Sequence, residues 1–202
     1  MKKRVSKKAQ ISAFIILAIL IVVVIAIFLS ITFKSSLEEE RINPVVSPIH
    51  NYVEACVKQT GEDSIFNIGN TGGYFISPNL SVGNTAIYFN KGENNMPSKE
   101  KMQDELSLYM NNMLFFCTRG FINFPDFNIS QREIKTKTVI ENNKVIFNVV
   151  YPISILKGEK TYSFEKFNAE VPVRLGLIYN ISEKIMQEQA LHKKDICLTC
   201  LS

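Results

Sequence analysis

The 202-residue sequence has only two histidines, His50 and His192. It also lacks the G-x-S-x-G, H-E-x-x-H and Walker A patterns, each of which places a nucleophile, a zinc-binding pair or a phosphate-binding lysine on a defined local structure. Two histidines leave little material for a general base. We therefore expect no catalytic activity and no bound cofactor.

Positive charge is scarce outside the first ten residues. The net charge of the chain is +4, and residues 1–10 contribute +5, so the remainder carries 4 − 5 = −1. A nucleic-acid-binding domain needs positive charge gathered on a folded face, and we expect no nucleic-acid partner. The five basic residues of this leader are Lys2, Lys3, Arg4, Lys7 and Lys8.

Residues 11–33 form the one long apolar run, without a charged residue. As a helix this run reaches about 34 Å, enough to cross the hydrocarbon core of a bilayer. A cleaved signal peptide has a shorter core and small residues before its cleavage site, whereas this run is followed by Lys34 and two serines. The sequence therefore predicts a retained transmembrane helix with the lipid bilayer as a partner.

The flanking charges predict the orientation of that helix. The leader, residues 1–10, is basic, while only Lys34 and Arg41 follow the span closely. Because basic flanks stay in the cytoplasm, we expect a single-pass protein of the cell membrane with a cytoplasmic N-terminus. Residues 34–202 are then extracytoplasmic, where thiols can be oxidised.

The exported part is long enough for one domain. Residues 34–48 are charged and then contain Pro44 and Pro48, which indicates a stalk. We assign residues 49–196 to one domain and residues 197–202 to a C-terminal tail.

Apolar residues at helical spacing predict three helices in the domain. The first starts at Ile49 and stops at Gly61, the second runs over residues 98–117, and the third over residues 174–191 with Leu175, Ile178, Ile181 and Ile185 as its stripe. The Gly72-Gly73 pair indicates a tight turn and not a phosphate-binding loop, because no Lys-Ser/Thr follows it.

Alternating and β-rich segments predict strands at residues 74–76, 86–89, 133–140, 145–151 and 161–164. Asn142-Asn143 suits a hairpin turn between the third and fourth of these. The predicted class is α+β, an N-terminal transmembrane helix followed by one extracytoplasmic domain of amphipathic helices packed on an antiparallel sheet.

Cys56 and Cys117 lie on the apolar stripes of the first two predicted helices. If both helices cover the same sheet, the sulfurs can meet, and a disulfide is the first interpretation. The alternative is a pair of buried free thiols that act as small hydrophobic groups.

Cys197 and Cys200 form a C-x-x-C pair two residues from the end of the sequence. Such a pair is a short-loop disulfide or two idle thiols, half of a zinc site, or a redox dithiol. His192 is the nearest further metal ligand, but zinc would need one more, so no metal site is expected.

Three Asn-x-Ser triplets fit the glycosylation sequon. Their asparagines are Asn79, Asn128 and Asn180, all on the exported side of the predicted span.

The leader carries a resemblance to a known family. Lys7 and Lys8, then Ala9 and Gln10, lead directly into the apolar helix, and this resembles the class III signal of archaeal type IV pilins. The resemblance implies peptidase cleavage between Ala9 and Gln10. Many pilins have Glu at the fifth mature position, where this chain has Phe14, so filament assembly is not implied.

The rest of the chain resembles an uncharacterised group of small archaeal membrane-anchored proteins. The residues that carry this resemblance are 52–56, 72–74, the helix ending at Cys117, 171–175 and 197–201. That group brings no activity with it.

We therefore expect a membrane-anchored extracytoplasmic structural or binding protein, of which a pilin-like surface subunit is one form. Its further partners would be other copies or other envelope proteins that contact its transmembrane helix. The alternative is an extracytoplasmic thiol-redox or metal-binding protein that acts through Cys197 and Cys200.

Overall fold

The computed structural model describes residues 20–23 and 42–192. The chain divides into two compact units, residues 1–43 and 44–202. In the first unit, residues 20–23 are helical with exposed side chains, and the rest of the predicted span at 11–33 lies outside the described residues. No helix within the described residues is both long and apolar enough to cross a membrane.

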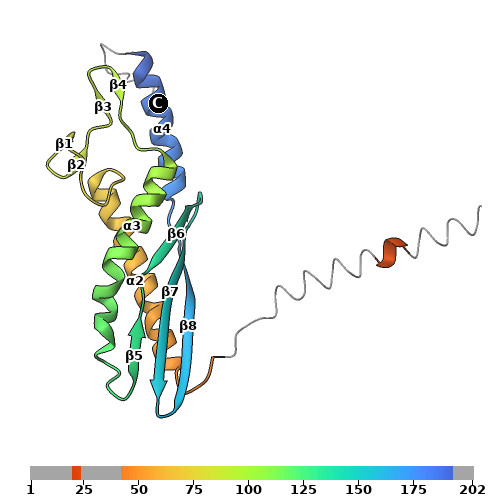
Figure 1. Ribbon diagram of the computed structural model, residues 1–202. Helices are drawn as coiled ribbons and strands as arrows, with labels where there is room; N and C mark the ends of the chain where they lie inside the picture. Colours follow the sequence, from red (N-terminus) through yellow and green to blue (C-terminus); the bar gives the residue numbers. More distant parts are fainter. Residues whose placement is uncertain (1–19, 24–41, 193–202) are drawn as a thin grey trace, which may run out of the picture. The chain divides into compact units, whose positions relative to one another are not determined.

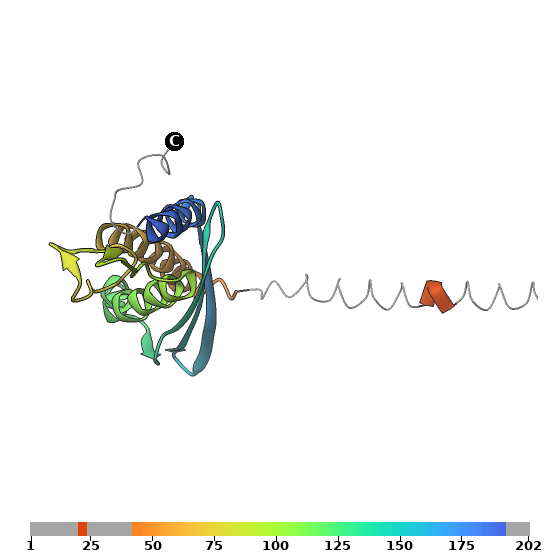
Figure 2. The ribbon, with the colours of Figure 1, turned by 90° about the horizontal axis from the view of Figure 1, so that it is seen from above.

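The second unit is α+β, as the sequence predicted. Figure 1 shows its elements, and Figure 2 shows α2 and α3 on the same side of the sheet. The helices are α2 (Ser47–Thr71), α3 (Lys99–Thr118) and α4 (Leu175–Leu191), with a short 3-10 turn at Arg119–Phe121. The strands of the main sheet are β5 (Asn128–Gln131), β6 (Lys135–Ile140), β7 (Val145–Lys157) and β8 (Lys160–Val171).

Strand β7 is the centre of the antiparallel sheet. It pairs with β8 along its whole length on one side; on the other it pairs first with β6 and then with β5. The register to β8 shifts between Val150 and Ile153. Pro152 lies in this irregular stretch, where a residue without an N–H group is tolerated, and its carbonyl accepts a hydrogen bond from Arg132 N at 3.0 Å.

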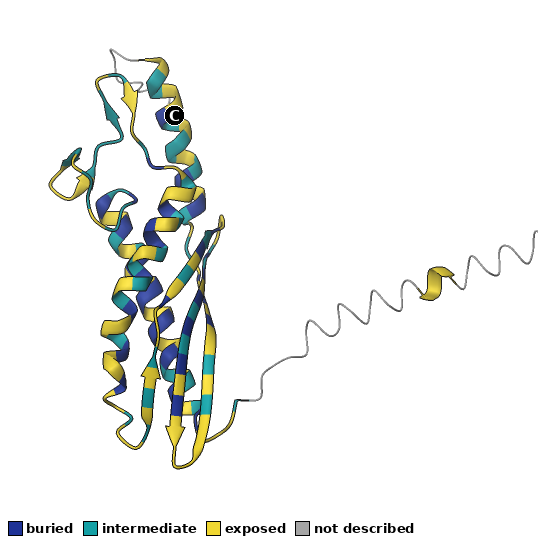
Figure 3. Ribbon diagram, in the orientation of Figure 1, coloured by how far each residue is buried: buried dark blue, intermediate teal, exposed yellow. Residues whose placement is uncertain are grey.

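The predicted alternation in β7 is confirmed and continues beyond the expected end at residue 151. Its odd-numbered residues from Val145 to Ile155 face the helices and are buried, while Asn148 and Ser154 on the other face are exposed (Figure 3). The largest buried side chains of β7 and β8 are Tyr151, Phe147 and Phe167. One face of the sheet therefore carries the core.

Helix α2 does not stop at Gly61, as the sequence predicted, but continues to Thr71. A Cβ atom at Gly61 would lie 2.9 Å from Phe147 Cε2. Glycine is needed here because α2 approaches the aromatic ring on β7 too closely for a side chain. The helix also starts two residues before Ile49, and Val46 is already buried.

Gly72 and Gly73 end helix α2, which agrees with the predicted turn. Both have positive φ, +71° and +90°, and Gly73 N donates to Ile68 O at 2.7 Å. This is the left-handed closure for which glycine is the usual residue.

The predicted strand at 74–76 is absent. Instead, two small hairpins follow, β1 (Ser81–Val82) with β2 (Thr85–Ala86), and β3 (Phe89–Asn90) with β4 (Glu93–Asn94). Phe75 N donates to the buried Glu105 carboxylate at 2.8 Å, so the backbone there pairs with helix α3 and not with a strand. The same carboxylate accepts from Lys101 at 2.7 Å, and this hydrogen bond raises the pKa of Lys101.

Helix α4 exists where the sequence predicted it, but its expected stripe is not its buried face. Ile178 and Ile181 are exposed, while Gly176, Tyr179 and Met186 are buried. A Cβ atom at Gly176 would lie 2.5 Å from Glu141 O. The helix therefore packs against the β6–β7 turn, and the periodicity alone did not reveal which face is covered.

Two glycines of α2 provide a matched test of this packing. We expect Gly61→Ala to lower the free energy of unfolding by about 2 kcal/mol through overpacking against Phe147. We expect Gly69→Ala, where an added Cβ meets nothing within 4 Å, to raise it by up to about 1 kcal/mol through helix propensity. Denaturant unfolding of the full chain in detergent, followed by circular dichroism, measures both. Equal effects would contradict the close approach at Gly61.

Candidate functional site

The structure confirms the disulfide between Cys56 and Cys117. Their Cα atoms lie 5.6 Å apart, and the bond joins α2 to α3 across a sequence separation of 61 residues. Cys56 is buried and Cys117 half-buried. The alternative of two free thiols is therefore wrong for this pair.

An aromatic cluster surrounds the end of α3 next to the disulfide. Tyr52 Oη donates to Cys117 O at 2.9 Å. Its ring contacts Phe121 and Phe124, with centroids 6.5 and 5.4 Å away. The first turns of α2 and the C-terminal end of α3 are thus held together by a covalent bond, a hydrogen bond and ring packing.

Several predicted site residues lie outside the described residues, namely Ala9, Gln10, Cys197 and Cys200. His192 is the last described residue and is exposed. Its backbone N–H donates to Gln189 O at 3.1 Å. Among the described residues, no three His, Cys, Asp or Glu side chains gather closely enough to hold a metal ion.

The three sequon asparagines lie in different surroundings. Asn79 is exposed in the loop before β1, and Asn128 is exposed at the start of β5. Asn180 lies within α4, where its side chain accepts from Lys99 Nζ at 3.2 Å and donates to Asn142 Oδ1 at 3.4 Å. Asn79 and Asn128 are therefore more exposed than Asn180.

A row of polar side chains on α3 faces the edge of strand β6. Ile140 N donates to Gln103 Oε1 at 2.9 Å, and Thr138 N donates to Ser107 Oγ at 3.1 Å. Gln103 and Ser107 are four residues apart, so they lie on one side of the helix. They satisfy backbone donors that an edge strand would otherwise leave open.

The next residue of this row is Asn111, four positions further along α3. The next alternate residue of β6 is Thr136. Both Asn111 Oδ1 and Thr136 Oγ1 are buried and have no hydrogen-bond partner within the described structure. Buried polar atoms are usually satisfied, so this position can accept a donor group from a bound molecule or water.

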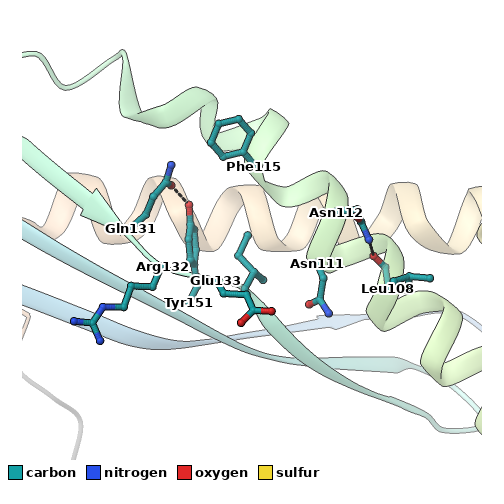
Figure 4. Close-up of a pocket in the computed structure, with 9 residues that line it drawn as sticks. Leu108, Asn111, Asn112, Phe115, Gln131, Arg132, Glu133 and Tyr151 are labelled. Atoms are coloured by element: carbon teal, nitrogen blue, oxygen red, sulfur yellow. Dashed lines mark hydrogen bonds between the residues drawn. The ribbon is translucent and has the colours of Figure 1, made fainter.

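A groove opens at this point between α3 and the chain that joins β5 to β6. Its volume is about 460 Å³, and Figure 4 shows the side chains around it. Its lining combines amides, one arginine, one glutamate, two aromatic rings and aliphatic groups: Leu108, Asn111, Asn112, Phe115, Gln131, Arg132, Glu133, Ile134 and Tyr151.

The floor of the groove is ordered by internal hydrogen bonds. Tyr151 Oη donates to Gln131 Oε1, and burial raises the pKa of the Tyr151 phenol, which keeps it a donor. Asn112 Nδ2 donates to Leu108 O at 2.7 Å. A second hollow of about 370 Å³, also lined by Leu108 and Asn111, continues along α3 toward Thr138.

This arrangement can bind a polar molecule, because it offers amide oxygens and nitrogens beside apolar surface. Sequence reasoning missed it. The signal was present as Gln103, Ser107 and Asn111, three polar residues spaced by four within a helix, but nothing in the sequence placed them opposite β6.

Comparisons of the chain with protein-family models, with curated proteins and with solved structures find no match. Its function is therefore inferred from its own residues.

The disulfide gives a first prediction for this region. The double variant Cys56→Ser with Cys117→Ser is expected to lose about 4 kcal/mol of unfolding free energy, the chain-entropy value for a loop of this length. Cys197→Ser with Cys200→Ser is the matched control and should cost much less. Denaturant unfolding and mobility on non-reducing gels measure both, and equal losses would contradict a stabilising role for the Cys56–Cys117 bond.

The polar row on α3 gives a second prediction. Ser107→Ala removes the acceptor of Thr138 N and is expected to destabilise the domain by about 2 kcal/mol. Asn111→Ala removes an oxygen without a partner and is expected to change stability by about 0.5 kcal/mol or less. The two midpoints of denaturant unfolding test this, and a large loss for Asn111→Ala would mean that its amide already has a structural role.

Proposed function

We propose that this protein is a single-pass membrane-anchored, extracytoplasmic structural or binding protein without catalytic activity. Residues 11–33 are its transmembrane helix, residues 1–10 its cytoplasmic leader, and the α+β domain its outward-facing part. A pilin-like surface subunit is one form of this function, and the resemblance of the residues around Ala9 and Gln10 to a class III signal supports it.

The disulfide between Cys56 and Cys117 is the observation that carries this proposal. Disulfides persist in oxidising compartments and are rare in the cytosol. The basic leader independently favours export of the same segment. Two unrelated features, thiol oxidation and flanking charge, thus support the same location for the domain.

The groove along α3 favours binding over a purely structural role. Asn111 Oδ1, in a residue that lines both hollows, and Thr136 Oγ1, in a residue that lines the second one, are buried oxygens without partners in the described structure. The apolar Leu108 also lines both hollows. These groups can recognise a bound molecule through hydrogen bonds and through apolar contacts. The groove has no histidine in its lining, so its residues suit holding a molecule better than transferring protons.

Protease accessibility tests the predicted topology. We expect an epitope tag placed after Ser202 to be digested in right-side-out membrane vesicles without detergent, because the domain lies outside. The chain should also resist alkaline extraction from the membrane. A control variant with the five basic leader residues changed to glutamine should lose part of this orientation. A tag digested only after detergent is added would refute the export of the domain.

Mass spectrometry of the mature N-terminus tests the pilin-like processing. Cleavage after Ala9 gives a chain that begins at Gln10, and Ala9→Leu should block it because the implied peptidase cuts after a small residue. A wild-type chain that retains Lys2 would identify a plain membrane anchor and leave the proposed topology intact.

A further inference from the structure

An aromatic pair is exposed at the C-terminal end of α3. Phe115 and Phe116 have 49% and 66% of their surface accessible, and Ile122 just beyond the helix has 68%. The two phenylalanine rings contact each other edge to face, with centroids 6.1 Å apart. Burial of such groups is favourable, and exposed apolar clusters mark interaction or membrane-contacting surfaces.

The backbone turn that follows this aromatic pair has an energetically unfavourable conformation. Arg119, Gly120 and Phe121 have positive φ values of 46°, 60° and 63° in succession. Only glycine adopts this conformation freely. The turn sends Phe121 into the core and leaves Arg119 and Ile122 exposed.

The aromatic pair lies at the end of the domain where the chain enters from the predicted anchor. Tyr52, in the second turn of α2, donates to Cys117 O and packs against Phe121 and Phe124. The end of α3 therefore lies beside the first turns of α2. Phe66, by contrast, is 14 residues beyond Tyr52 on the same helix, which is about 21 Å along its axis.

The tether between the predicted span and the domain is short. Residues 34–43 separate Phe33 from Pro44, and ten residues extend to at most about 35 Å. If residues 11–33 span the bilayer as proposed, a tether of this length keeps the first residue of the domain within about 35 Å of the bilayer surface. Because the tether gives this end of the domain a high local concentration near the bilayer, weak apolar contacts are sufficient for it to bind the lipid surface.

We propose that the end of the domain formed by Phe115, Phe116 and Ile122 rests on the lipid bilayer to which the chain is anchored. This inference rests on the proposed function, because it requires the anchor. The aromatic and aliphatic side chains enter the boundary between headgroups and acyl chains, as they do on amphipathic interfacial elements. The exposed charges at this end of the domain include Arg119, Asp126 and Lys157, whose Nζ lies 4.4 Å from the Phe127 ring centroid. The contact that we propose is made by the apolar side chains, and a comparison of low and high salt separates it from attraction between charges.

The absence of tryptophan from the sequence allows a direct test. Phe116→Trp places a single tryptophan at the proposed contact, and Phe66→Trp places one on α2, where Phe66 is 75% exposed, as a matched control. Each full chain is reconstituted in phosphatidylcholine vesicles with and without brominated acyl chains. We expect blue-shifted, bromine-quenched emission from Phe116→Trp at low and high salt, and unquenched, water-like emission from Phe66→Trp.

A third variant tests whether the neighbouring apolar groups take part. Phe115→Asn and Ile122→Asn, added to Phe116→Trp, should reduce quenching because they remove the other contact groups. Equal quenching at both tryptophan positions would overturn the proposal, and so would blue-shifted emission without bromine quenching, which would indicate burial against another protein copy. Alkaline extraction of the same vesicles reports the anchor separately, so an anchored chain with unquenched Phe116→Trp refutes this contact alone.

Discussion

The close approach of helix α2 to strand β7 sets the geometry of the whole domain. At Gly61 the helix backbone lies so near the Phe147 ring that a single added carbon would meet it at 2.9 Å. The same helix carries Cys56, whose sulfur is bonded to that of Cys117 on α3. Helix α3, fixed in this way, lies where Gln103 and Ser107 can meet the edge of β6. The groove and the exposed aromatic end are both positioned by this arrangement.

The sequence predicted much of this fold because each main element repeats a local pattern. The period of α3 and the alternation from Val145 to Tyr151 are both readable without tertiary context. Gly61 was misread because its function depends on Phe147, 86 residues later (147 − 61). For α4, Ile178 and Ile181 were expected inside, but the turn at Glu141 covers the other side of the helix. A local sequence pattern shows which residues share one face of a helix or strand, but it does not show which other element covers that face.

The candidate site was predicted only in part. Cys56 and Cys117 could be paired from their positions on two apolar stripes, because the number of helices that can share one small sheet is limited. The groove could not be predicted, because it arises where β5 ends and β6 begins on the same edge of β7. Asn111 belongs to α3 and Thr136 to β6. Only the folded arrangement of the sheet and the helix brings both residues to the same hollow.

The covalent link between α2 and α3 also has a mechanical meaning. A molecule held in the groove contacts α3, and the predicted anchor precedes α2. Tension between them would run from α3 through Cys117 to Cys56 and then along α2 to the entry of the chain. The intervening residues, including both small hairpins, are bypassed and carry no load. The Cys56–Cys117 bond therefore keeps α3 attached to the first turns of α2 when the chain between these two cysteines is pulled open.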